Sequence, residues 1–215
     1  MASRLGDQTA RLQGRITLNP AAHVDPIGTL LFPAVVIFGP LLGFHLPFML
    51  IGWAKPTPVI TRNFRKIVRD ENLVSLAGPL SNFLLAAIAI GVLVVMAHVV
   101  PNGPGVAMDS YLLALGEDTA TGAHPIAVLA SLAIIVNLSL TFFNLLPIPP
   151  LDGSHVVRNL LPYNAARAYD RVGGWISYIL MMFVGGYVLR MAVTPILVFV
   201  YHLLLHMQTA PVVMQ

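Results

Sequence analysis

Two apolar runs restrict what this chain can fold into more than any other feature of its sequence. The first covers residues 73–100 and the second covers residues 126–147. A helix of about 20 apolar residues crosses the hydrocarbon core of a bilayer, and both runs reach that length. Hydrophobic residues make up 57% of the chain and charged residues only 10%, whereas soluble domains are roughly one quarter charged. We therefore predict an all-α, polytopic membrane protein that forms a single domain over residues 1–215.

A third apolar region, residues 29–53, is also long enough to span a bilayer but is interrupted. Pro33, Pro40 and Pro47 break the run every few residues, and proline disrupts the hydrogen bonding of a helix interior. Basic residues both precede and follow the region. This arrangement favours a re-entrant or kinked hairpin that leaves on the side it entered, with protein covering its backbone. An ordinary single span is the alternative.

The first and last parts of the chain are less regular. Residues 1–28 are polar, with apolar residues at alternating positions, a pattern that is typical of a short β-hairpin. They lack the features of a secretory signal peptide, and we expect none. Residues 175–207 are apolar and long enough for one or two further helices, which we expect to divide near Thr194 and Pro195.

The distribution of charge predicts the orientation of the spans. The loop 101–125 contains acidic residues but no Lys or Arg, whereas basic residues gather in 54–72 and again after residue 152. Because Lys and Arg accumulate in cytoplasmic loops, we expect 54–72 inside the cell and 101–125 outside. The net charge is +3. The basic residues flank apolar runs and form no patch on a soluble domain, so we expect no nucleic-acid partner.

The residue types present limit the possible chemistry. The chain has no cysteine, which excludes disulfides, cysteine-bound zinc and a thiol nucleophile. Asp152 ends the stretch FFNLLPIPPLDG at 142–153, so its carboxylate lies at the cytoplasmic end of the second predicted span. Either Asp152 binds a ligand there, or Asp152 and Gly153 form a turn or the N-cap of the next helix.

Polar residues inside or next to the apolar runs are further candidates. Asn82 and Asn137 place amides within predicted spans, where an unbonded polar group costs free energy. Asn144 and Pro147 come just before the aspartate motif. All four residues are candidates for a binding role. The alternatives are helix packing with a satisfied amide for Asn82, and an ordinary helix end for Asn144 and Pro147.

Four stretches, in order, resemble the site-2 protease family of intramembrane zinc metalloproteases, and in particular one prokaryotic branch of it. NLLPIPPLDG at 144–153 is similar to the aspartate motif of the family. The N-terminal stretch RLGDQTARLQGRITLNPAAHVDPIGT, then IGWAKPTPV with RNFR at 62–65, and AGPLSN at 77–82 follow in the order of that branch. The resemblance covers nearly the whole chain and weakens after residue 175.

The resemblance implies a metalloendopeptidase that cleaves peptide bonds within or near the transmembrane segments of protein substrates. It also implies a multi-pass protein of the inner (plasma) membrane of a prokaryotic cell. In that family one zinc ion is held by both His of an HExxH helix and by the Asp of the LDG motif, and the Glu of HExxH acts as general base. Asp152 matches the Asp ligand. Gly78 and Asn82 match a Gly-x-x-x-Asn pattern that faces the substrate channel of the family. The resemblance thus implies that substrate is bound by Asn82, Asn137, Asn144 and Pro147.

The HExxH motif does not occur in the sequence, whose two glutamates are Glu71 and Glu117. In the family it comes directly before the stretch that begins here at Ser3, so we expect both His ligands and the base upstream of Met1. One alternative is a metal-free homologue that binds transmembrane segments without cutting them. Another is a small transporter or channel subunit, which the absence of paired ionisable groups within the predicted spans disfavours.

Overall fold

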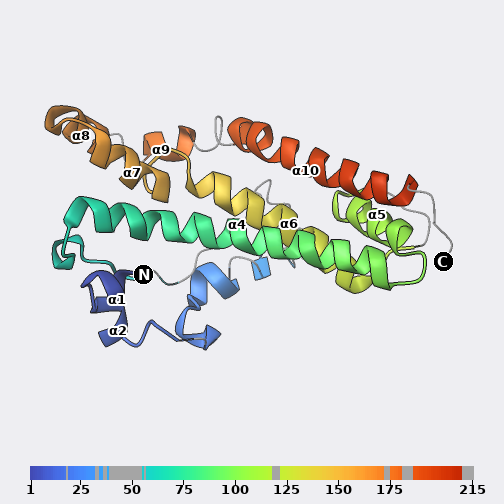
Figure 1. Ribbon diagram of the computed structural model, residues 1–215. Helices are drawn as coiled ribbons and strands as arrows, with labels where there is room; N and C mark the ends of the chain where they lie inside the picture. The colour runs from blue at the N-terminus through green and yellow to red at the C-terminus, as the bar shows by residue number, and fades with distance from the viewer. Residues whose placement is uncertain are drawn as a thin grey trace. The chain divides into compact units, whose positions relative to one another are not determined.

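The computed structural model describes residues 1–17, 19–31, 34–35, 38, 55, 57–117, 122–171, 175–180 and 186–209. These residues form helices, turns and loops, and no β-strand occurs among them, so the predicted all-α class is confirmed (Figure 1). The chain divides into two compact units, Met1–Asp70 and Glu71–Gln215. The predicted single domain over 1–215 stays a prediction, and the units are described separately below.

Three of the described helices are long and apolar enough to cross a membrane: α4 (Ile67–Val99), α6 (Pro125–Asn144) and α10 (Gly186–Thr209). The apolar runs that predicted the first two spans fall on α4 and α6. Helix α6 ends at Asn144, and the segment after it is rich in proline, which cannot donate a backbone hydrogen bond to continue a helix.

The predicted break near Thr194 and Pro195 is wrong. Helix α10 continues through Pro195, while the short helix α9 (Trp175–Leu180) precedes it. A proline within an apolar span is tolerated because neighbouring groups satisfy the backbone carbonyl that it leaves free. The described residues of the region 175–207 therefore form one short helix and one long helix.

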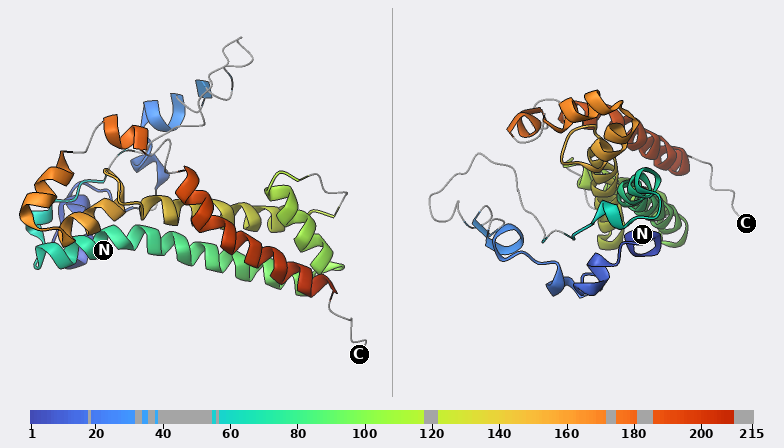
Figure 2. Two further views of the ribbon diagram at one scale, coloured as in Figure 1. Left: turned by 90° about the horizontal axis from the view of Figure 1, so that it is seen from above. Right: turned by 90° about the vertical axis from the view of Figure 1, so that its left-hand side faces the viewer.

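Helix α5 (Gly103–Ala114) is a finding that the sequence analysis did not predict, since that segment was taken as an outer loop. Its Ala107 and Tyr111 are fully buried, and the Tyr111 hydroxyl donates to the carbonyl oxygen of Leu197 in α10 at 2.7 Å. Helices α5, α6 and α10 pack against one another, and Figure 2 shows α10 ending beside α5. This hydrogen bond joins α5 to the middle of α10.

Alanines lie where α4 and α6 contribute to the core of the second unit. Ala86, Ala89 and Ala97 of α4 lie in one buried cluster with Ala127 and Ala130 of α6. Small side chains let helix backbones approach closely, which is how helices associate where lipid removes the hydrophobic driving force. The outward faces of these helices carry many exposed large apolar residues, as expected for surfaces that meet acyl chains.

The β-hairpin predicted over 1–28 is wrong. The described residues form helices α1 (Ala2–Leu5) and α2 (Thr9–Leu12), a 3-10 turn (Pro20–Ala22) and a π-helical turn (Pro26–Leu31). A further 3-10 turn covers Thr61–Asn63. The re-entrant hairpin predicted over 29–53 lies almost entirely outside the described residues.

The buried carboxylate of Asp7 explains why this segment is not a strand. It accepts hydrogen bonds from the backbone N–H of Thr9 at 3.1 Å and of Ile60 at 2.8 Å, and from the Asn63 amide at 3.0 Å. A side chain that bonds the backbone nearby favours turns and helix ends over an extended ladder. The alternating pattern therefore did not determine the local structure.

Candidate active site

Asp152 is the first residue of helix α7 (Asp152–Leu160), which is followed by helix α8 (Tyr163–Asp170). The N-cap of α7 is Leu151 rather than Asp152, so the N-cap alternative for Asp152 does not hold. The buried side chains of Leu146, Ile148 and Leu151 form one cluster. This cluster anchors the proline-rich connection between α6 and α7, and with it the start of α7.

The Asp152 carboxylate approaches α4 at a glycine. Its Oδ2 lies 3.3 Å from the point that a Cβ on Gly78 would occupy. The side chain is partly buried, and among the described residues it has no hydrogen-bond partner. Burial raises the pKa of Asp152 because it removes water from the charged form, and the nearby His155 opposes that rise. A partly buried carboxylate without a hydrogen-bond donor is suited to hold a cation.

Gly153 determines how closely α7 meets the end of α6. A Cβ at this position would lie 2.2 Å from the carbonyl oxygen of Leu145 and 2.7 Å from that of Leu146. No real side chain can occupy that space. Asp152 thus supplies the carboxylate, and the glycine that follows it allows α7 to begin close to the end of α6.

The predicted residues of α4 share one face of the helix. Gly78 and Asn82 are four residues apart, so Asn82 lies one turn beyond Gly78 on the side that Asp152 approaches. Asn82 is partly buried, and its amide has no hydrogen-bond partner within the described part of the chain. The structure thus brings Asp152 and Gly78 together and places Asn82 on the same face.

The candidates on α6 also share a face, because Asn137 and Asn144 are seven residues apart. Each amide donates to a carbonyl one turn earlier, Asn137 to Ala133 at 2.8 Å and Asn144 to Leu140 at 2.9 Å. Asn137 lines a hollow of about 360 Å³ that α4 and α6 form together. The carbonyl oxygen of Pro147 accepts from the Tyr169 hydroxyl at 2.9 Å.

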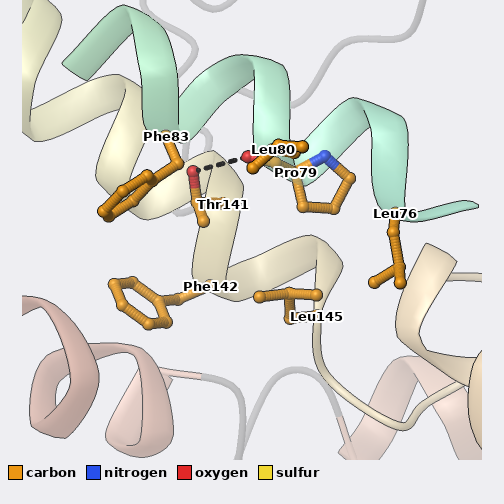
Figure 3. A pocket seen from close by; sticks show the side chains of 7 residues that line it. All are labelled: Leu76, Pro79, Leu80, Phe83, Thr141, Phe142 and Leu145. Atoms are coloured by element: carbon orange, nitrogen blue, oxygen red, sulfur yellow. Dashed lines mark hydrogen bonds between the residues drawn. The ribbon is translucent and has the colours of Figure 1, made fainter. Parts of the chain in front are cut away.

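A second hollow of about 410 Å³ lies between α4 and α6 (Figure 3). Across its wall the Thr141 hydroxyl donates to the carbonyl oxygen of Pro79 at 3.2 Å. Leu76, Leu80 and Phe83 follow a helical spacing on a different face of α4 from Gly78. The residues that line this hollow are Leu76, Pro79, Leu80, Phe83, Thr141, Phe142 and Leu145.

A polar network that the sequence analysis missed joins α7 to α4. The Asn159 amide donates to Glu71 Oε2 at 3.0 Å and to Asn72 Oδ1 at 2.8 Å. His155 Nδ1 lies 3.3 Å from Glu71 Oε1. The sequence contained one usable signal, since Asp152, His155 and Asn159 follow a helical spacing on one side of α7. The partner residues, some 80 positions earlier in the chain, could not be inferred from it.

No group of at least three His, Asp or Glu side chains that could hold a metal is found in the part of the chain that the structure describes. Asp152 is the candidate ligand that this part contributes. The fold and the site together define a class of protein: a helical membrane protein with a partly buried carboxylate at the point where one apolar helix ends.

Comparison with known proteins identifies the family within this class. The profile of "Peptidase family M50" matches residues 63–187. A protein of Bacillus subtilis (strain 168), named "Putative zinc metalloprotease YwhC", is 38% identical over 162 residues, which cover 75% of this chain and 61% of that relative. The chain belongs to peptidase family M50, the site-2 proteases. No solved structure matches it.

The profile match contains all the candidate site residues. The chain spans 61% of the length of the curated relative. The match to a metalloprotease family confirms the resemblance noted in the sequence and implies zinc. The residues inside the matched range are Gly78, Asn82, Asn137, Asn144, Pro147 and Asp152.

Proposed function

We propose that the protein is an intramembrane zinc metalloprotease that cleaves peptide bonds within or near the transmembrane segments of its substrates. The observation that carries this proposal is the carboxylate of Asp152, partly buried, without a hydrogen-bond donor among the described residues, and directed at Gly78 on a membrane-spanning helix. Membership of peptidase family M50 supports it. The bilayer would be the medium of the reaction, and the inner membrane of a prokaryotic cell its location.

The residues present fit one part of a zinc site. Asp152 would supply one oxygen ligand, and Gly78 leaves room for its carboxylate. Zinc bound by three protein ligands lowers the pKa of a bound water and polarises a carbonyl group. The other ligands and the general base would be the two His and the Glu of an HExxH motif, as the family resemblance implies.

The chain's own amides would hold an extended substrate. Every backbone group of an α-helix interior is already hydrogen-bonded, so the substrate must unwind locally before a peptide carbonyl can react. The unwound strand then needs hydrogen-bond partners, because lipid provides none. Asn82, Asn137 and Asn144 would provide them, each through amide oxygens that the described contacts leave free. Pro147, on the connection to α7, would lie beside the strand.

Replacing the candidate ligand by its amide is the direct test. Asp152→Asn keeps the size of the side chain but removes the negative charge that binds zinc. We expect the purified protein, expressed from its gene, to contain zinc and to cleave a single-span reporter substrate, and the variant to lose both. Glu117→Gln, the same change at an exposed position after α5, is the matched control and should behave as the wild type.

The same experiment distinguishes the proposed protease from the main alternative. A metal-free homologue would capture the reporter without cutting it, would carry no zinc, and would be indifferent to Asp152→Asn. That combination of results would contradict the proposal.

A further inference from the structure

Both carboxylate oxygens of Glu71 are occupied by side chains of α7. Oε1 lies 3.3 Å from His155 Nδ1, and Oε2 accepts from the Asn159 amide at 3.0 Å. The same Asn159 amide also donates to Asn72 Oδ1 at 2.8 Å. The Glu71 side chain is only 12% exposed, whereas that of His155 is 46% exposed. Each carboxylate oxygen of Glu71 therefore has one partner on α7.

The contacts of Glu71 fall on the side of α7 that carries Asp152. Asp152, His155 and Asn159 stand at positions i, i+3 and i+7 of this helix, so they form one stripe. One end of the stripe meets Gly78, and the other end meets Glu71 and Asn72. Because Glu71 and Gly78 are also seven residues apart, α7 lies along a single face of α4.

Helix α7 needs such a contact. It has 9 residues, and isolated helices of that length are marginal in water. The apolar cluster around Leu151 and the close approach of Gly153 to Leu145 fix where α7 begins. These contacts act at the first residues of α7, whereas its later turns meet α4 through the contacts of Glu71 with His155 and Asn159. The ion pair of Arg158 with Asp170 at 2.8 Å joins α7 to α8 rather than to α4, and both side chains are 45% exposed.

We infer that Glu71 is a positioning residue, which holds the polar stripe of α7 against α4 and so keeps the Asp152 carboxylate directed at Gly78. The link to metal binding rests on the proposed function. The placement of α7 against α4 does not depend on the proposed function and can be measured separately. Removing a partner from a metal ligand's supporting contacts typically costs about 10–100-fold in metal affinity.

The test compares three variants. Glu71→Ala removes both contacts. Glu71→Gln retains them, since its amide oxygen can accept from Asn159 and its nitrogen can donate to a bare Nδ1 of His155. Asp170→Asn weakens the other polar contact of α7 and leaves the contacts with α4 intact, so it is the matched control.

The placement of α7 is read out with spin labels. The chain has no cysteine, so a pair introduced at Leu84 of α4 and Leu160 of α7, which are 60% and 77% exposed, reports the distance between these helices. We expect a narrow distance distribution in the wild type, Glu71→Gln and Asp170→Asn, and a broadened one in Glu71→Ala. Zinc affinity should fall about 10–100-fold in Glu71→Ala alone.

Two results would overturn the inference. A wild-type distance distribution in Glu71→Ala would show that Glu71 does not position α7. A broadened distribution with unchanged zinc affinity would show that the position of α7 does not govern Asp152. If the wild-type protein itself bound no zinc, the proposed function would fail, and the distance measurement would still decide whether Glu71 holds the helix.

Discussion

Gly78 and Gly153 lie on either side of the candidate ligand, and each lacks a side chain for a different reason. At Gly78 the missing Cβ leaves room for the free end of the Asp152 side chain, 3.3 Å away. At Gly153 the obstacle would be backbone, which cannot move aside without displacing the end of α6. The position of Asp152 is thus limited by small residues as well as by polar contacts.

Gly153→Ala should therefore destabilise the protein. The new Cβ would meet the Leu145 carbonyl oxygen at 2.2 Å, and forcing an additional methyl group into a packed site costs about 1–3 kcal/mol. The free energy of unfolding in mixed micelles, with increasing SDS, measures the loss. Gly91→Ala in α4, where a Cβ meets nothing within 4 Å, should instead stabilise by roughly 0.5–1 kcal/mol. Equal effects of the two changes would contradict the close approach.

The sequence indicates Asp152 as a candidate ligand, but it does not indicate the side chains that lie around helix α7. The acid stands out because it ends an apolar run and belongs to a motif. Glu71 looked like one more charge in a basic segment, since its partners His155 and Asn159 come from a helix more than 80 positions later. The predicted substrate contacts of Asn82, Asn137, Asn144 and Pro147 stay predictions.

At the scale of helices, a hydrogen bond from a threonine hydroxyl of α6 to the carbonyl oxygen of a proline joins α6 to α4. The single hydroxyl proton of Thr141 is shared between the Pro79 carbonyl oxygen at 3.2 Å and the Asn137 carbonyl oxygen at 2.8 Å. Thr141→Val keeps the shape but loses the bond between the helices. Such bonds contribute on average about 0.6 kcal/mol in membrane proteins, and we expect that loss in the same unfolding assay. Thr141→Ser keeps the hydroxyl and should retain the bond; a loss as large as that of valine would exclude this explanation.

The N-terminal helices should be sensitive to acid through Asp7. Its hydrogen bonds with Thr9, Asn63 and Ile60 hold the pKa of the carboxyl well below its usual range. A lowered folded-state pKa means that the stabilisation is complete above the unfolded-state pKa and is lost as the pH falls below it. Hydrogen–deuterium exchange in residues 1–17 and 57–66, corrected for its intrinsic pH dependence, should stay slow down to about pH 4 and then accelerate.

Asp7→Asn is the matched variant for this measurement. It replaces an acceptor oxygen by a donor that faces other donors, so exchange should be faster at neutral pH and should no longer respond to acid below pH 4. An acid response of the same size in the variant would assign the effect to another group.

A helix could be predicted from the sequence where neighbouring residues determine it, and not where contacts with distant residues do. The spans α4 and α6 follow from hydropathy, which is a property of consecutive residues. Helix α5 was missed because what holds it is tertiary, such as the bond from Tyr111 to Leu197. The N-terminal hairpin was predicted from alternation, but Asp7 bonds Ile60, 53 positions later, and that contact favours turns over strands.

At the scale of the whole molecule, the described spans and the charges agree on one orientation. The loop between α5 and α6 has no Lys or Arg, whereas Arg158, Arg167 and Arg171 follow α6. By the positive-inside rule, α4 would then leave the cytoplasm and α6 would return to it. Asp152 follows the end of α6, so this orientation would place it on the cytoplasmic side, where water could reach the proposed hydrolytic site.

Cysteines introduced on the two sides test this orientation, and the cysteine-free chain provides the unlabelled control. Glu117→Cys after α5 and Ala168→Cys on α8 are both at exposed positions. In cells whose plasma membrane is intact and accessible, a membrane-impermeant maleimide should label Glu117→Cys at once. It should label Ala168→Cys only after the membrane is opened. Labelling of both positions in intact cells would mean that α6 does not span, and the reversed pattern would place Asp152 on the outer side, where the charge distribution does not put it.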